Sequence, residues 1–123
     1  MPMRVLIVED FDDTRELLSM IVRMKGCEAS EARDGAEAVL MAVSVRPDLI
    51  LMDLNMPVLD GWEATRRIHA ARETSHIPVV AISAQCDGDW RDRALAAGAR
   101  ECVGKPVDFA TFDRLLDRYP TLH

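Results

Sequence analysis

The sequence has no apolar run long enough to cross a membrane. Its longest runs, such as residues 79–84, are far shorter than the roughly 20 apolar residues that a membrane helix needs. A basic stretch followed by an apolar one, the pattern of a secretory signal, is also missing from the first residues. We therefore expect a cytoplasmic protein without membrane insertion.

Cysteine is scarce and odd in number. Cys27, Cys86 and Cys102 are widely spaced, which suits neither a disulfide framework nor a zinc site. The three histidines have no metal-ligand spacing either. The sequence thus predicts three reduced cysteines that serve packing, and no zinc centre.

Positive charge is in deficit. The 15 lysines and arginines against 21 aspartates and glutamates give a net charge of −6, which repels the phosphates of nucleic acids and disfavours direct binding to them. With 123 residues, 49% of them hydrophobic and 29% charged, the chain has the size and composition of one globular domain. We expect a single domain over residues 1–123, with no effector domain.

Short β-branched runs alternate with helical patterns along the chain. Continuous apolar runs at residues 4–8, 48–52 and 78–82 are typical of strands that are buried on both faces of a parallel sheet. Weaker strand signals lie at 27–32 and 100–103. Five strand and helix pairs in alternation predict an α/β fold, an open doubly wound sandwich with right-handed crossovers.

Apolar stripes mark three of the expected helices and predict which side of each helix faces the sheet. The stripes are Leu17, Leu18, Ile21 and Val22, then Ala36, Val39, Leu40 and Val43, then Phe109, Phe112, Leu116 and Tyr119. Two further helices are expected at 62–71 and 89–97. Asp12 or Asp13 is expected to cap the first helix.

Polar side chains follow four of the expected strands at their carboxyl ends, where ligands bind in such sheets. They are Glu9 and Asp10 after the first strand, Asp53 after the third, Ser83 after the fourth and Lys105 after the fifth. Each alone has a structural explanation, as an acid at a helix start, a turn-opening aspartate or a loop hydroxyl. Their joint position at one edge of one sheet favours a functional site.

The residue types at this edge suit phosphoryl chemistry with a metal ion. Clustered carboxylates repel one another unless a cation joins them, and carboxylate oxygens suit Mg²⁺. A lysine beside them is a charge clamp for a phosphoryl group, and a serine hydroxyl can donate to one of its oxygens. An aspartate in this setting can itself be the nucleophile that forms an acyl phosphate.

These residues belong to motifs that together resemble the receiver domain of two-component response regulators. The motifs are Val5-Leu6-Ile7-Val8-Glu9-Asp10, Asp53-Leu54-Asn55-Met56-Pro57, Asp60-Gly61, Ser83-Ala84 and Lys105-Pro106. The resemblance covers essentially the whole chain, whose size is close to that of single-domain chemotaxis regulators. It implies a flavodoxin-like (βα)5 sandwich with a five-stranded parallel sheet of order 2-1-3-4-5.

The resemblance also implies a signalling role rather than an enzymatic one. By this resemblance, Asp53 accepts a phosphoryl group from a histidine kinase or a histidine phosphotransfer protein. The chain catalyses only its own phosphorylation and dephosphorylation, and it signals through altered binding to a downstream protein. A cis Lys105-Pro106 peptide bond places the Lys105 ammonium so that it bridges to the phosphoryl group, and Ser83 swings to bind that group.

A Mg²⁺ site follows from the same resemblance. Asp10, Asp53 and the backbone carbonyl of Asn55 are the implied direct ligands, and Glu9 is implied to help through a water molecule. Glu9 stands where many members of the family have aspartate. Its longer arm is expected to reach a metal-bound water.

Two further roles are implied by position. Cys102 stands where many members carry an aromatic residue that turns inward on activation together with the residue at Ser83. Without that ring, activation is expected to move mainly the backbone after Ser83.

Asn55 and Gln85 flank the path of the water that hydrolyses the acyl phosphate, and both are uncharged, so we expect a water positioned by amides.

Three alternatives remain open at this point. The main one is a degenerate receiver that docks onto partners without phosphorylation, against which the complete set of site residues argues. A magnesium-dependent phosphohydrolase with an aspartyl nucleophile would need a second aspartate where Asn55 stands. A flavin-binding protein of this fold would need a phosphate-binding loop after the first strand, where Glu9 and Asp10 repel phosphate.

Overall fold

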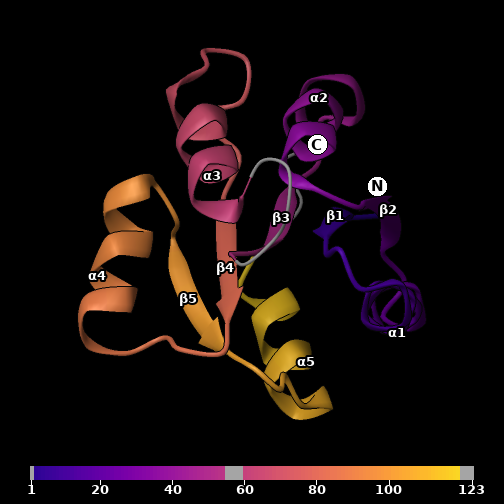
Figure 1. Cartoon of the computed structure of the whole chain (residues 1–123). Helices are drawn as coiled ribbons and strands as arrows, with labels where there is room; N and C mark the ends of the chain where they lie inside the picture. The colour runs from indigo at the N-terminus through magenta and orange to yellow at the C-terminus, as the bar shows by residue number, and fades with distance from the viewer. Residues whose placement is uncertain (1, 55–59, 120–123) are drawn as a thin grey trace.

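The computed structural model describes residues 2–54 and 60–119, in which strands and helices alternate (Figure 1). The elements are β1 (Arg4–Val8), α1 (Asp12–Met24), β2 (Glu28–Ala32), α2 (Gly35–Val45), β3 (Leu49–Asp53), α3 (Gly61–Ala70), β4 (Val79–Ser83), α4 (Gly88–Ala97), β5 (Glu101–Gly104) and α5 (Phe109–Asp117). Each corresponds to an element predicted from the sequence. None of the helices in these two stretches combines the length and the apolar character that crossing a bilayer requires.

The strands form one parallel sheet in the order β2-β1-β3-β4-β5, which confirms the order that the resemblance implies. Val8 at the end of β1 lies opposite Met52 of β3, and Asp53 lies opposite Ile82 of β4. Because the strands are parallel, their carboxyl ends meet at one edge of the sheet. The segments that follow β1, β3, β4 and β5 therefore gather at that edge.

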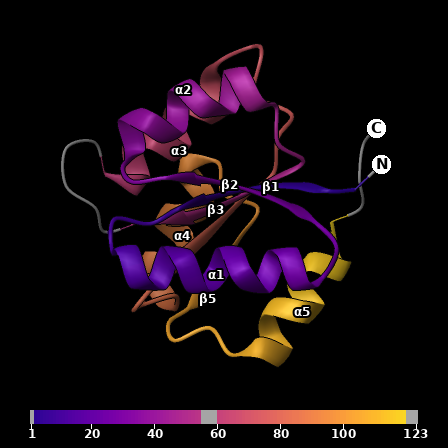
Figure 2. The ribbon, with the colours of Figure 1, turned by 90° about the vertical axis from the view of Figure 1, so that its right-hand side faces the viewer.

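Helices cover both faces of the sheet, as a doubly wound fold requires. Figure 2 shows α2 and α3 above the sheet and α1 and α5 below it, and α4 packs on the same face as α2 and α3. Side chains alternate along each strand, so β1 directs Val5 and Ile7 to one face and Leu6 and Val8 to the other. All four are at most 1% exposed, because β1 is covered on both sides.

The apolar stripe predicted for α2 is wrong in part. Ala38 and Ala42 of α2 are fully buried, whereas Leu40 and Val43 are 72% and 47% exposed. The sheet beneath α2 presents large side chains such as Met52. The helix therefore meets the sheet through its alanines, and its larger apolar side chains lie outside.

The start of α1 also differs from the prediction. The N-cap position is taken by Phe11, whose side chain makes no capping hydrogen bond, so neither Asp12 nor Asp13 is the cap. Asp12 instead forms an ion pair with Arg15, one helical turn further on. In the stripes predicted for α1 and α5, Leu17 and Phe109 are also more than half exposed.

The prediction of three reduced cysteines is wrong as well. The structure joins Cys86 to Cys102 in a disulfide whose Cα atoms are 5.5 Å apart, and it leaves Cys27 free. Cys102 lies on β5 opposite Ala81 of β4, and Cys86 lies in the segment that leaves β4. Spacing along the chain could not reveal this pair, because it is the pairing of β4 with β5 that brings the two residues together.

Candidate functional site

Three carboxylates meet where β1 and β3 end. Glu9 and Asp10 follow β1, and Asp53 is the last residue of β3. One carboxylate oxygen from each lies within 4.8 Å of the others. Glu9 and Asp53 are 3% exposed, whereas Asp10 is exposed. The structure thus brings together the three acids that the sequence placed at one sheet edge.

Lys105 completes the charge arrangement. Its Nζ lies 3.3 Å from Glu9 Oε1 and 3.3 Å from Asp53 Oδ1, so one ammonium group bridges two buried carboxylates. The Lys105-Pro106 peptide bond is cis, as the resemblance implies. About a third of the Lys105 side chain is exposed, at 34%, which leaves the site open to a ligand.

Ser83 ends β4 at the same edge and is buried. Its Oγ accepts a hydrogen bond of 3.3 Å from the Gln85 backbone N–H, and its carbonyl accepts one of 2.8 Å from the Lys105 backbone N–H. Ser83 and Lys105, the two residues expected to bind the phosphoryl group, are therefore in direct contact. Gln85 is exposed, and Asn55 lies outside the described residues.

Burial and like charge shape the protonation of this site. Burial raises the pKa of Glu9 to about 7, and the adjacent Asp53 adds to that rise while Lys105 opposes it. Burial alone would lower the pKa of Lys105, but Asp53 and Glu9 outweigh it and the pKa is raised. Lys105 is therefore a cation at neutral pH. The site carries excess negative charge that a divalent cation would neutralise.

Glu9 gives a testable pH dependence. In the metal-free protein its raised pKa means that the folded state holds a proton which the unfolded chain has already released between about pH 4.5 and 7. The stability that Glu9 contributes is present below that range and is lost as the pH rises through it, by on the order of 2 kcal/mol. Urea unfolding in chelator at several pH values measures this decline. This decline should be absent from the Glu9→Gln variant. A difference in unfolding free energy between wild type and variant that stays constant with pH would contradict the prediction.

Arg15 supports the site and was not anticipated. Its side chain is buried, and its Nη1 donates a 3.0 Å hydrogen bond to the Glu9 backbone carbonyl. Its other nitrogens bind the carboxylates of Asp12 and Glu31. This network fixes the segment between β1 and α1 that carries Glu9 and Asp10. The only signal in the sequence is the three-residue spacing of Asp12 and Arg15, which is too common to identify a supporting residue.

Gly61 supports the site in a different way. A Cβ atom at this position would lie 2.1 Å from the Asp53 carbonyl oxygen and 2.6 Å from the Leu54 Cα. The Gly61 N–H also donates to the Leu54 carbonyl at 3.2 Å. The start of α3 therefore packs directly on the backbone that carries Asp53. The Asp60-Gly61 motif marks the position in the sequence, but not this close approach.

Gly61→Ala is expected to destabilise the protein by at least about 2 kcal/mol, because the methyl group overlaps backbone atoms that cannot rotate away. Urea unfolding measures the effect. Gly104→Ala is the matched control, since a Cβ at Gly104 meets no atom within 4 Å. Equal unfolding midpoints for the two variants would show that α3 does not pack on β3 as described.

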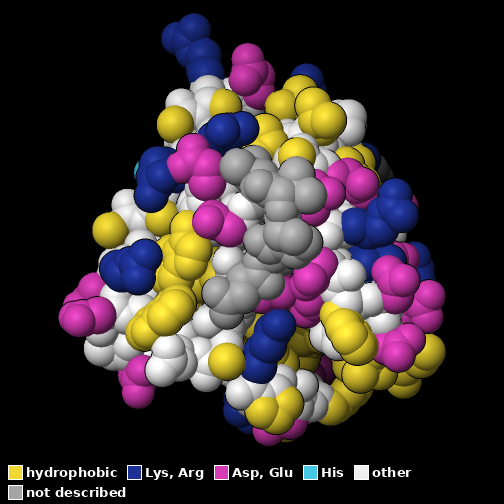
Figure 3. All heavy atoms as spheres, in the orientation of Figure 1, with side chains coloured by type: hydrophobic (Ala, Val, Ile, Leu, Met, Phe, Trp, Pro, Cys, Tyr) yellow, Lys and Arg dark blue, Asp and Glu magenta, His cyan; other side chains and the backbone are white. Residues whose placement is uncertain are grey.

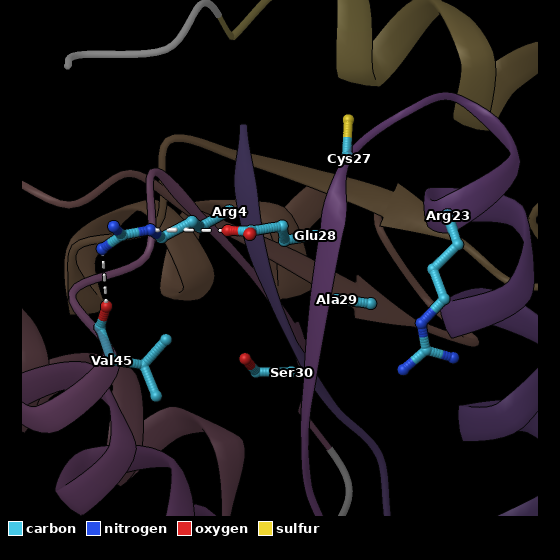
Figure 4. A pocket seen from close by; sticks show the side chains of 7 residues that line it. All are labelled: Arg4, Arg23, Cys27, Glu28, Ala29, Ser30 and Val45. Carbon is cyan, nitrogen blue, oxygen red and sulfur yellow. Dashed lines mark hydrogen bonds and ion pairs between the residues drawn. The ribbon is translucent and has the colours of Figure 1, made fainter. Parts of the chain in front are cut away.

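A groove of about 630 Å³ lies away from the acidic cluster, at the amino ends of β1 and β2 (Figure 4). Arg4 and Glu28 in its lining form an ion pair, with Arg4 Nε 3.6 Å from Glu28, and Arg4 Nη1 also donates to the Val45 carbonyl. Cys27 lines the groove, but burial raises the pKa of its thiol and so keeps it protonated. The groove lies at the opposite end of the strands from the acidic cluster and is not a candidate for the phosphoryl site.

Comparison with known proteins assigns the family. Residues 5–117 match the response regulator receiver domain. The chain belongs to this family. The receiver is 42% identical to the transcriptional regulatory protein PrrA of Mycobacterium leprae over 107 residues, which are 87% of this chain but only 45% of PrrA. It is 34% identical to the polar-differentiation response regulator DivK of Brucella anthropi over 119 residues, 97% of each chain.

A solved structure agrees with this assignment. The receiver domain of the sensor histidine kinase PA1611 from Pseudomonas aeruginosa, which holds a magnesium ion in its active-site cleft, matches with a TM-score of 0.88 at 34% identity. The match covers 97% of this chain and 98% of that one. Receiver domains are the phosphoacceptors of two-component signalling, and that is the role of this chain.

Proposed function

We propose that Asp53 is the residue of this receiver that accepts the phosphoryl group, and that its donor is the phosphohistidine of a histidine kinase or a phosphotransfer protein. One observation carries the proposal. Asp53 is a buried carboxylate that lies between two other acids and the Lys105 ammonium at the open edge of the sheet. A nucleophile, a cation to neutralise charge and an acidic metal site are the groups that phosphoryl transfer to a carboxylate requires.

In the transfer step, Asp53 acts as the nucleophile, and Lys105 and Ser83 bind the oxygens of the phosphoryl group. A carboxylate oxygen of Asp53 forms a bond to phosphorus while the bond from phosphorus to the donor's imidazole nitrogen breaks. The electron pair of the broken bond stays on that nitrogen, and the product on the receiver is an acyl phosphate. Lys105 donates a hydrogen bond to a phosphoryl oxygen, and the Ser83 hydroxyl donates to another after it turns from Gln85.

The acidic cluster fits a hard divalent cation. Three carboxylates within 4.8 Å of one another, two of them buried, are a donor set that Mg²⁺ accepts. Asp10 and Asp53 would hold the ion directly, Glu9 would act through a water molecule, and Asn55 would add its backbone carbonyl. The ion supplies positive charge to the phosphoryl oxygens. Glu9 must release its proton before the cluster reaches full charge, which Lys105 assists.

The donor protein needs a surface beside the site. A groove of about 450 Å³ runs from Glu9 and Lys105 to Leu17 of α1. Leu17, Met20 and Met24 are each more than half exposed and share one face of α1. This exposed apolar face lies beside the groove that leads to the site. It supports α1 as the helix that contacts a protein presenting phosphohistidine to Asp53.

The signal would leave through the face formed by α4, β5 and α5. Figure 3 shows hydrophobic side chains over the α3 and α4 positions of Figure 1. At the α3 side of this face, Trp62 of α3 and Trp90 of α4 lie with ring centroids 5.6 Å apart, and Arg93 of α4 lies over both rings. A downstream protein could bind this aromatic and basic surface.

Intact-mass measurement with acetyl phosphate, a small phosphoryl donor, tests the proposed function. With Mg²⁺ the receiver should gain the mass of one phosphoryl group, and in excess chelator it should gain none. Equal gain under both conditions would contradict a metal-dependent transfer. No gain under either condition would favour a degenerate receiver that acts by docking alone.

The lifetime of the acyl phosphate should depend on Asn55 and Gln85. Both side chains are uncharged, so neither can act as a carboxylate base toward the attacking water. Replacing both with alanine is expected to change the dephosphorylation rate while Mg²⁺ affinity stays nearly unchanged, because Asn55 would bind the ion through its backbone. The loss of phosphorylated mass with time, after the donor is removed, measures this rate. Unchanged decay in the double variant would rule out the role.

A further inference from the structure

We propose that Cys86 and Cys102 form a reversible oxidation site whose disulfide weakens phosphoryl binding at Asp53. The proposal rests on the proposed function of Asp53. It adds a covalent modification that depends on two residues outside the phosphoryl site. The observations that carry it are the disulfide itself and its place between Ser83 and Lys105.

The disulfide joins the two segments that carry the phosphoryl-binding side chains. Cys86 lies three residues after Ser83, and Cys102 lies three residues before Lys105. Cys86 Sγ is 3.9 Å from the Ser83 carbonyl oxygen, which also accepts the Lys105 backbone N–H. The crosslink therefore anchors the end of β4 to β5 directly beside both residues.

Ser83 shows why this anchor matters for the site. Its hydroxyl oxygen accepts the Gln85 backbone N–H, so the segment between Ser83 and Cys86 sets the orientation of the hydroxyl. Turning the hydroxyl toward a phosphoryl oxygen changes that contact and moves the segment. A disulfide at Cys86 opposes the movement because it ties the far end of a three-residue span to β5.

The two cysteines are placed for oxidation by a small molecule. Both are half-buried rather than enclosed, so a peroxide can reach them. One thiolate attacks the peroxide, which is cleaved to give a sulfenic acid and one water, and the second thiol displaces the hydroxyl as another water. Two thiols and one hydrogen peroxide thus give one disulfide and two waters. A dithiol reverses the step by thiol–disulfide exchange and is itself oxidised to a disulfide.

Cys27 provides an internal comparison. It is half-buried like the other two, but it lines the groove of Figure 4 at the opposite end of the strands, away from the Cys86–Cys102 pair, and the pKa of its thiol is raised. The structure leaves it free. Oxidation should therefore consume two of the three thiols and spare Cys27.

Beryllofluoride with Mg²⁺ supplies the test, because it stands in for the phosphoryl group on Asp53 without a transfer reaction. The protein is prepared with dithiothreitol or with hydrogen peroxide, and alkylation followed by intact mass counts its free thiols. Fluorine NMR then measures bound beryllofluoride directly. We expect the apparent dissociation constant of beryllofluoride to be about tenfold higher in the oxidised protein, a size typical of coupling between two sites.

Two variants separate this effect from general oxidation. The double variant Cys86→Ser, Cys102→Ser should bind beryllofluoride equally well after either treatment. Cys27→Ser, which keeps the pair, should retain the difference seen in the wild type. Circular dichroism of each protein confirms that it is folded.

Equal or tighter binding by the oxidised wild type would overturn the inference while leaving the role of Asp53 intact. So would three alkylated thiols after peroxide treatment. Failure of both forms to bind beryllofluoride would instead contradict the proposed function, and with it the inference.

Discussion

Asp53→Asn is expected to abolish phosphorylation by acetyl phosphate in the presence of Mg²⁺. The amide has no negative charge to attack phosphorus and is a much poorer metal ligand than the carboxylate. Intact-mass measurement should detect no phosphoryl group on the variant at times when the wild type is largely modified. The variant should also be folded, because it removes a charge that repels the buried Glu9.

Asp13→Asn is the matched control for this prediction. Asp13 is an exposed acid in the first turn of α1, close in sequence to the site but outside the acidic cluster. It should be phosphorylated as well as the wild type. Phosphorylation of Asp53→Asn at the wild-type rate would show that another residue accepts the group.

Lys105→Ala is expected to slow phosphorylation by about 10²–10³-fold, the loss typical of removing one charged group that stabilises a transition state. Lys105 bridges Glu9 and Asp53 and is the cation through which this chain meets the incoming phosphoryl oxygens. Its removal leaves two buried carboxylates without that partner. Mg²⁺ should therefore bind the variant at least as tightly as the wild type, because the ion no longer competes with an ammonium group.

The separation of these two effects is the decisive part of the Lys105 measurement. Rates of mass gain are compared at Mg²⁺ concentrations that saturate each protein, and Mg²⁺ affinity is measured separately. Lys105→Arg, which retains the charge with a different shape, should recover part of the rate. A rate in Lys105→Ala equal to that of the wild type would mean that Lys105 only balances charge in the resting protein.

The sequence predicts the acidic cluster because the cluster depends on topology rather than on fine packing. Once β1 and β3 are identified as parallel strands, their ends must be adjacent, and Glu9 and Asp53 follow. The same reasoning places Lys105. No detail of side-chain packing enters this argument, which is why a pattern of strand ends was sufficient.

Features set by packing were predicted less well. The buried face of α2 consists of Gly35, Ala38 and Ala42, because large side chains of the sheet leave room only for small residues, whereas helical spacing of apolar residues favours Leu40 and Val43. The network around Arg15 and the approach of Gly61 to Asp53 depend on distances between segments far apart in the sequence. Local patterns contain no such distances.

The disulfide between Cys86 and Cys102 is a mixed case. Cys102 departs from the pattern of the family, many members of which have an aromatic residue at this position. The predicted consequence, an absent ring, omitted the second cysteine. The strand pairing that brings the two cysteines together was itself implied by the resemblance, so the pair could have been found by combining the two observations.

Borohydride trapping tests the central claim most directly. Borohydride reduces an acyl phosphate to an alcohol, so a phosphorylated aspartate is converted to homoserine and can be located by peptide mapping. After treatment with acetyl phosphate and Mg²⁺, we predict homoserine at position 53 and at no other acidic position, and none when chelator replaces Mg²⁺. Homoserine at Asp10 or another aspartate, the longer alcohol 5-hydroxynorvaline at Glu9, or homoserine at position 53 in chelator would contradict the account.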